Sequence, residues 1–357
     1  MRVGWLDAAR GLGIVAIVIG HSYIPGQETE PLLVLLYSFH VPLFLFLAGL
    51  TFDPSKYRLA RLLRRKGRTV VLPYFIWALV SIPVFVVLGT LAAEGLGRGA
   101  RSFQLGDSLV GMLWSNPDGG AMKWNTPLWF LTALFTTQLV YWGLCWLMKG
   151  SLRQPWLILG ASLVISWLSL AFLSPLDPPW SLERVGILLP FFALGSLVGP
   201  WALRIQGEGR RGWALLGGAL MLGAAFGVAM ANGPVDYVTK HFGSYGLFLL
   251  AASLGVAGVL LLALGLGESR LLRYLGGASL TILVLHKFPV VAAQVMIART
   301  GFGGSSMDTL VIVAVAGMAM LASVAFHPLL RRCFPVSIGL STPNRRGGPR
   351  AGKPASA

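Results

Sequence analysis

The sequence predicts an all-α protein that crosses a lipid bilayer about ten times and keeps both chain ends in the cytoplasm. Hydrophobic residues make up 55% of the chain and charged residues 12%, and the mean hydropathy is +0.72. Ordinary soluble domains carry about 25% charged residues, so this composition is typical of a membrane protein. The spacing of the apolar stretches and the distribution of basic residues support the same class.

Ten apolar stretches are long enough to span a bilayer, which takes about 20 residues each. The ninth has His286 and Lys287 in its middle. If it is re-entrant, the C-terminus moves to the outside. The stretches are 5–24, 31–51, 69–92, 127–148, 155–173, 185–203, 212–231, 245–265, 276–297 and 307–329.

The basic residues give the orientation of the chain. With the N-terminus inside, 21 of the 29 lysines and arginines fall in inner segments and six in outer segments. Such an excess of positive charge marks the cytoplasmic side of a multi-pass protein, here expected in the cell inner membrane. The same distribution accounts for the net charge of +16 without a nucleic-acid partner.

The chain divides into a membrane domain at 1–330 and a basic tail at 331–357. The tail is rich in Pro, Gly, Arg and Ser, a composition typical of disorder. The outer segment 93–126 is too short for a separate domain but long enough to cover an outward-facing site. The two cysteines form no zinc-type cluster with histidines, so no metal site is expected.

The first span, WLDAARGLGIVAIVIGHSY, combines Asp7, Arg10 and His21. Arg10 and His21 are eleven residues apart, which puts them on one helix face, roughly 16 Å apart along the axis. Ionisable groups within a membrane usually face the bundle interior and mark function. The alternative is that Arg10 pairs with Asp7 near the membrane surface and His21 only ends the helix.

Five segments in order resemble the acyltransferase-3 family of integral membrane O-acyltransferases, in particular its fucose 4-O-acetylase-like branch. The resemblance covers about residues 5–330, and Val284 stands where the family often has tyrosine. The five segments are Asp7–Arg10 with His21, SFHVPLFLFLAGLTF at 38–52, RRKGRTVVLPYF at 64–75, NTPLWFLTALF at 125–135 and ASLTILVLHKFP at 278–289.

The resemblance implies transfer of an acyl group, above all acetyl, from cytoplasmic acyl-CoA to a hydroxyl of a carbohydrate or lipid-linked glycan of the cell envelope. Acetyl-CoA would be a substrate, with no bound cofactor. Such a reaction needs a base for the hydroxyl proton and donors for the oxyanion. Histidine titrates near neutral pH, so His21 is the expected base. Arg10 would orient the donor or stabilise charge through its planar guanidinium.

Five further residues each have a functional and a structural interpretation. Arg65 and Arg68 would bind the CoA phosphates, or act only as a positive-inside anchor that attracts anionic lipids. His40 and His286 fall near the expected midplane and would line a polar lane between donor and acceptor, or only hydrogen-bond neighbouring helices. Trp129 would stack on a sugar, or belong to an interfacial aromatic belt.

Two other functions are compatible with a row of polar side chains through a helical bundle. One is a transporter that exports a saccharide or a modified metabolite. The other is a membrane scaffold, which has no use for an ionisable face on the first span. If the protein is an acyltransferase, the acyl group passes either directly to the acceptor or through a transient acyl-enzyme.

Overall fold

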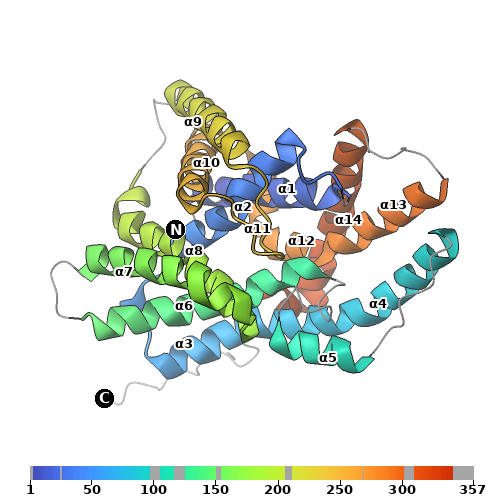
Figure 1. Cartoon of the computed structure of the whole chain (residues 1–357), viewed down its shortest axis with the longest axis horizontal. Helices are drawn as coiled ribbons and strands as arrows, with labels where there is room; N and C mark the ends of the chain where they lie inside the picture. The colour runs from blue at the N-terminus through green and yellow to red at the C-terminus, as the bar shows by residue number, and fades with distance from the viewer. Residues whose placement is uncertain are drawn as a thin grey trace, which may run out of the picture.

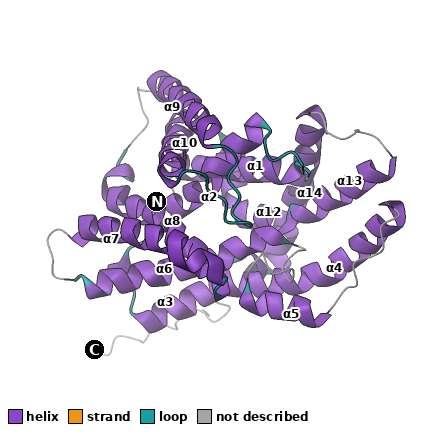
Figure 2. Cartoon of the chain, viewed as in Figure 1, coloured by secondary structure: helices purple, strands orange, loops and turns teal. Residues whose placement is uncertain are grey.

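The computed structural model describes residues 3–24, 26–96, 105–115, 125–149, 154–205, 211–267, 269–300 and 309–340. These residues are helical almost throughout, as the purple ribbons of Figure 2 show. Within them the only β-type pairing is an isolated bridge between Asp236 and His241. The all-α class that the composition predicted is confirmed.

The helices form a bundle in which α1 runs through the middle and contacts α2, α10, α11 and α14 (Figure 1). The helices are α1 Gly4–Ser22, α2 Pro31–Leu50, α3 Leu59–Lys66, α4 Leu72–Leu96, α5 Leu105–Trp114, α6 Trp129–Leu147, α7 Gln154–Leu168, α8 Leu182–Ala202, α9 Arg211–Asn232, α10 Tyr245–Leu266, α11 Arg270–Gly277, α12 Ser279–Leu285, α13 Lys287–Thr300 and α14 Thr309–Cys333.

Nine helices of the described chain are long and apolar enough to cross a membrane. They correspond to the second to tenth predicted stretches. The helix α1, which corresponds to the first, is not in this set, and Asp7 and Arg10 lower its hydropathy. The helix α1 packs on α2, α10, α11 and α14, and its polar groups Asp7, Arg10 and His21 are partly buried there. The chain is therefore a polytopic helical membrane protein.

The third span begins earlier than the sequence suggested. The apolar helix runs from Leu59 to Leu88, whereas the expected stretch started at residue 69. It consists of α3, the π-helical turn η2 at Gly67–Val71, and α4. Arg65 and Arg68 therefore lie on a continuous helix and not in a loop before it. A π-helical turn inside a longer helix often accompanies a functional site.

The ninth stretch is helical on both sides of His286. It bends at Ala278, between α11 and α12, and again at His286, between α12 and α13. The part from Ser279 to Ile297 is long and apolar enough to span. These bends bring His286 and Lys287 against the end of α1.

Glycines allow the backbones of α1 and α11 to touch. A Cβ on Gly276 would lie 1.8 Å from the carbonyl oxygen of Asp7, and one on Gly11 would lie 2.2 Å from that of Leu272. Real carbon atoms cannot approach so closely, so any side chain here separates the helices. Close approach through glycine is how membrane helices commonly associate.

We expect Gly276→Ala to destabilise the protein by about 1–3 kcal/mol or more, because overpacking must push α11 away from α1. The matched control is Gly277→Ala, since a Cβ there meets nothing within 4 Å. It should be neutral or slightly stabilising, because alanine favours a helix over glycine by about 0.5–1 kcal/mol. Thermal unfolding of the two purified variants measures the difference. Equal melting temperatures would contradict the close approach.

The packed domain extends beyond the expected boundary at residue 330. The helix α14 ends at Cys333, and a short 3-10 helix, η7, follows at Pro335–Ile338. The indole Nε1 of Trp77 donates to the carbonyl oxygen of Ser337 at 2.8 Å, which ties η7 to α4. Of the predicted tail, residues 341–357 lie outside the described residues.

The orientation is tested by thiol labelling. Cys333 is an exposed native cysteine expected inside, and His241 is an exposed residue of a segment expected outside. On intact cells, a membrane-impermeant maleimide should label a His241→Cys protein and leave the wild type unlabelled. Opening the inner face should then expose Cys333. Labelling of the wild type in intact cells would reverse the orientation.

Candidate active site

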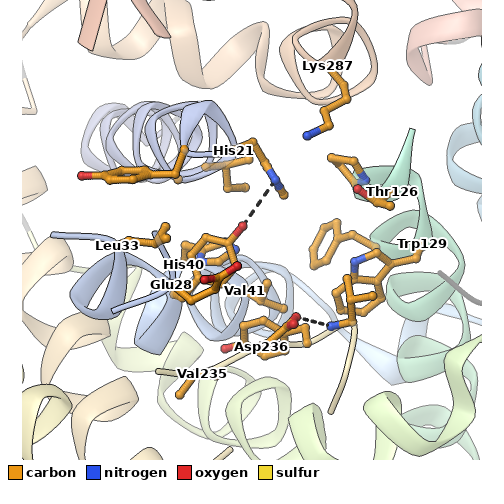
Figure 3. Close-up of a pocket in the computed structure, with 18 of the residues that line it drawn as sticks. His21, Glu28, Leu33, His40, Val41, Thr126, Trp129, Val235, Asp236 and Lys287 are labelled. Atoms are coloured by element: carbon orange, nitrogen blue, oxygen red, sulfur yellow. Dashed lines mark hydrogen bonds between the residues drawn. The ribbon is translucent and has the colours of Figure 1, made fainter. Parts of the chain in front are cut away.

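A cavity of about 370 Å³ opens where α1 ends. Its walls come from the end of α1, from α2, from the start of α6, from the junction of α12 and α13, and from the segment 234–238 (Figure 3). Its polar lining consists of His21, Tyr23, Glu28, Tyr37, His40, Thr126, Trp129, Asp236, Tyr237, Lys287 and Gln294.

His21 lies in the last turn of α1 and lines this cavity. The amide nitrogen of Gln294 on α13 donates to the carbonyl oxygens of Ser22 at 3.3 Å and of Tyr23 at 3.1 Å. These bonds satisfy carbonyls that the end of a helix leaves without partners. The hydroxyl of Tyr37 lies 3.5 Å from Nδ1 of His21. Gln294 thus holds the end of α1 through its backbone, and Tyr37 on α2 lies next to the imidazole.

His40 is in the middle of α2, one turn beyond Tyr37, and also lines the cavity. Its ring centroid is 4.8 Å from that of Tyr37. Nδ1 of His40 is 2.8 Å from the carbonyl oxygen of Leu36. A carbonyl only accepts, so Nδ1 carries the hydrogen and Nε2 of the neutral ring is an acceptor.

His286 lies directly behind His21, with the two ring centroids 5.3 Å apart. It is fully buried, and its Nδ1 donates to the carbonyl oxygen of Ile282 at 2.9 Å. Its Nε2 is buried and has no hydrogen-bond partner among the residues that the structure describes. In the neutral ring this nitrogen is an acceptor beside His21. The structure therefore brings His21, His40 and His286, which the sequence separated by up to 265 positions, to one place.

Trp129 forms a wall of the cavity and is only 5% exposed, so it does not belong to an interfacial belt. Its ring stacks with that of Tyr237 at 27°, with centroids 6.2 Å apart. The guanidinium of Arg184 lies 5.8 Å from the Trp129 centroid. Aromatic faces of this kind suit the apolar faces of a sugar ring.

Arg184, one of the six basic residues counted in the outer segments, is buried in the structure. The side chain is completely buried and forms an ion pair with Glu183, which is also buried. Its guanidinium donates to the carbonyl oxygens of Tyr237 and Val238. A buried charge is costly unless it is paired and hydrogen-bonded, and here both conditions hold. Arg184 thus anchors the segment that carries Tyr237 to α8.

The cavity contains charges of both signs. Glu28 and Asp236 are its carboxylates, and Lys287 is the only lysine or arginine among its lining residues. Asp236 accepts from the backbone nitrogen of Val238 at 2.7 Å, which makes it part of a turn. Glu28 accepts from the backbone nitrogen of Gly26, and this hydrogen bond lowers the pKa of Glu28. Glu28 therefore stays ionised at neutral pH.

Arg10 is not part of this cavity lining. Its Nη1 lies 2.9 Å from Oδ1 of Asp7, and the Arg10 side chain is 31% exposed. The ion pair is the one that the alternative interpretation of the first span proposed. Arg10 and His21 remain about 16 Å apart along α1, given 1.5 Å per residue.

A second cavity, of about 1020 Å³, lies at the opposite end of α2, beside α3 and the start of α4. Arg65 and Arg68, the two residues expected to bind CoA phosphates, both line it. We call it the arginine pocket, and the described residues that line it include no carboxylate. Its lining residues are Arg58, Ala60, Arg61, Arg64, Arg65, Arg68, Thr69, Leu72, Val336, Gly339 and Leu340.

The helix α12 lies between the two cavities. Leu283 lines the histidine-containing cavity, and a Cβ on Gly339 of the arginine pocket would come within 3.0 Å of the Leu280 side chain. Three residues of helix rise only about 4.5 Å. One turn of α12 therefore separates a residue next to the arginine pocket from one that lines the other cavity.

The segment 93–126, expected to cover an outward site, is described only in part. Within it, α5 packs beside α4 and α6: Tyr74 donates to the carbonyl oxygen of Met112 at 2.6 Å, and Ser115 and Thr132 share a hydrogen bond of 2.6 Å. No residue of α5 lines the histidine-containing cavity. The ranges 97–104 and 116–124 lie outside the described residues.

Sequence reasoning missed Tyr37 and Lys287 as site residues. Tyr37 is three residues before His40, so the two share a helix face, and this spacing was a usable signal. Lys287 was named only as a charged residue in the middle of the ninth apolar stretch, and no role was predicted for it. A lysine in a membrane span is itself a signal of function. In the described part of the chain, no three His, Cys, Asp or Glu side chains are grouped to bind a metal ion.

A polytopic helical protein with a histidine-lined cavity at one end and an arginine pocket at the other belongs to a narrow class. The model of the acyltransferase-3 family, described as an acyltransferase domain, matches residues 3–327. The chain therefore belongs to this family and is a membrane acyltransferase. The comparisons found no match among curated proteins or among solved structures.

Proposed function

We propose that this protein transfers an acetyl group from cytoplasmic acetyl-CoA to a hydroxyl of an envelope carbohydrate or lipid-linked glycan, at the inner membrane. The observation that carries the proposal is His21 at the surface of a cavity with stacked aromatic rings. The volume of about 370 Å³ is within the range of small-molecule sites, about 300–1,000 Å³.

The donor is assigned to the arginine pocket. Five arginines line it, and guanidinium groups bind phosphate oxygens through paired hydrogen bonds. The CoA moiety carries phosphates at one end and the thioester at the end of a thin pantetheine arm. With the phosphates on Arg65 and Arg68, the arm would extend past α12 toward His21. Arg10, in the inner half of α1, belongs to the donor side in this proposal.

The acceptor is assigned to the histidine-containing cavity. The ring of Trp129, stacked with Tyr237, offers a face for the apolar side of a sugar. The ionised Glu28 and the acceptor Nε2 of His40 suit hydrogen bonds from hydroxyl groups. A hydroxyl of the bound sugar then lies within reach of His21.

In the reaction, His21 takes the proton of the acceptor hydroxyl while its oxygen attacks the thioester carbonyl carbon. The carbonyl electrons move to oxygen, giving a tetrahedral oxyanion. The C–S bond then breaks, the ester remains on the sugar, and the proton held by His21 goes to the sulfur to give free CoA. The ring of His286 lies 5.3 Å from that of His21 and forms part of the buried surroundings of this base.

The test compares the carbohydrates of cells with and without the gene by mass spectrometry. We expect one glycan or glycolipid to lose the mass of an acetyl group when the gene is deleted and to regain it on complementation. Unchanged masses together with accumulation of a saccharide inside the cell would instead support a transporter.

A further inference from the structure

We propose that Lys287 is a further catalytic residue, whose ammonium group binds the oxyanion of the tetrahedral intermediate. This inference rests on the proposed function, because it assigns a role within that reaction. It also moves charge stabilisation at the reacting carbon from Arg10 to Lys287.

Lys287 lies at the same end of the cavity as His21 (Figure 3). It is the first residue of α13, directly after the break at His286, and it lines the cavity. Figure 3 shows its side chain reaching into the cavity, with the amino group directed between His21 and Thr126. Lys287 and His21 line the same cavity. A carbonyl attacked by an oxygen that His21 deprotonates lies near both groups.

The charged groups around Lys287 leave its ammonium without an anionic partner among the described residues. No hydrogen bond or ion pair of Lys287 is found with the described residues, although carboxylates occur elsewhere in the cavity. Glu28 is held by the backbone of Gly26, and Asp236 by Val238 and Thr239. A cation in a partly buried site, with no anionic partner among the described residues, is costly until negative charge appears beside it.

The chemistry supplies that negative charge. When the acceptor oxygen adds to the thioester, the carbonyl oxygen gains a full charge, and a preorganised cation beside it stabilises the transition state more than the ground state. Arg10 cannot fill this role at His21, because it lies about 16 Å away along α1 and is paired with Asp7. Among the described residues that line the cavity, Lys287 is the one lysine or arginine.

The experiment measures CoA thiol released from acetyl-CoA by the full chain in proteoliposomes, with octyl glucoside monomers or water as the acceptor. We expect Lys287→Met to lower kcat by about 10²–10³, as removal of an oxyanion donor typically does. The KM for acetyl-CoA should stay unchanged, since the donor is held elsewhere. Lys149→Met, which removes a lysine beside Trp146 and outside the cavity, is the matched control and should behave like wild type.

A chemical rescue separates catalysis from folding. In a Cys333→Ser background, Lys287→Cys treated with 2-bromoethylamine regains an ammonium at nearly the same distance from the backbone. We expect kcat to recover by about tenfold or more, with an unchanged melting temperature. The inference is overturned if Lys287→Met stays within about threefold of wild type, or if alkylation confirmed by mass leaves a folded protein inactive. Absence of thiol release by the wild type would instead overturn the proposed function and, with it, this role.

Discussion

His21→Ala should lower the rate of acyl transfer by about 10²–10⁴, the usual contribution of a general base. The imidazole lines the cavity beside the Tyr37 hydroxyl and next to His286. The amount of folded protein should not change, because Gln294 binds the end of α1 through backbone carbonyls and not through the His21 side chain. Initial rates of CoA release in proteoliposomes measure the effect.

The matched control is His241→Ala, which removes an exposed histidine outside the cavity and should leave the rate unchanged. Tyr37→Phe tests whether the Tyr37 hydroxyl helps to position the imidazole of His21. It removes only the hydroxyl near Nδ1 of His21, so a smaller loss is expected than for His21→Ala. If the His21→Ala protein transfers acyl groups at a rate near that of wild type, the mechanism is wrong.

Replacing Arg65 and Arg68 together by glutamine should raise the KM for acetyl-CoA by about 100-fold or more, because each charged hydrogen bond contributes about 1.5–3 kcal/mol. Both side chains line the arginine pocket, and no carboxylate of that lining offsets them. The kcat at saturating donor should change far less, since neither residue reaches His21. Steady-state kinetics at varied acetyl-CoA concentrations separate the two parameters.

The control removes two positive charges from the same side of the membrane. Arg331 and Arg332, in the last turn of α14, are exposed and are not part of the pocket lining. Their double replacement by glutamine should leave the KM nearly unchanged. An equal rise in both double variants would reduce Arg65 and Arg68 to a general electrostatic attraction for anions.

The sequence predicted the helical membrane fold because that fold depends on apolar length and charge placement, which are readable along the chain. The apolar runs correspond to helices even where Pro42 and Pro83 interrupt them. The packing of residues 335–338 could not be read from the sequence, because they stand between Arg331-Arg332 and a Pro-, Gly- and Arg-rich stretch. In the structure Ser337 and Ile338 are buried, and Trp77 donates to the carbonyl oxygen of Ser337.

The candidate site was only partly readable, because its parts meet through folding. The spacing of Arg10 and His21 on one face predicted a shared site, yet α1 ends at the cavity and leaves Arg10 a distance of about 16 Å away. Arg184 was counted only as one of the basic residues in an outer segment between two apolar runs. It became a buried anchor because its partners, Glu183 and the carbonyls of Tyr237 and Val238, lie in one neighbouring and one distant segment.

The most direct test of the central claim follows an isotope label across the membrane. Acetyl-CoA labelled in its acetyl group is enclosed in proteoliposomes that carry the protein, oriented so that the arginine pocket faces the lumen, with glycolipid from the gene-deleted cells in the bilayer. We predict that the label appears as an ester on the carbohydrate at the outer face, and that it fails to do so with the His21→Ala protein. Movement of the saccharide across the bilayer with no label on it would contradict the account.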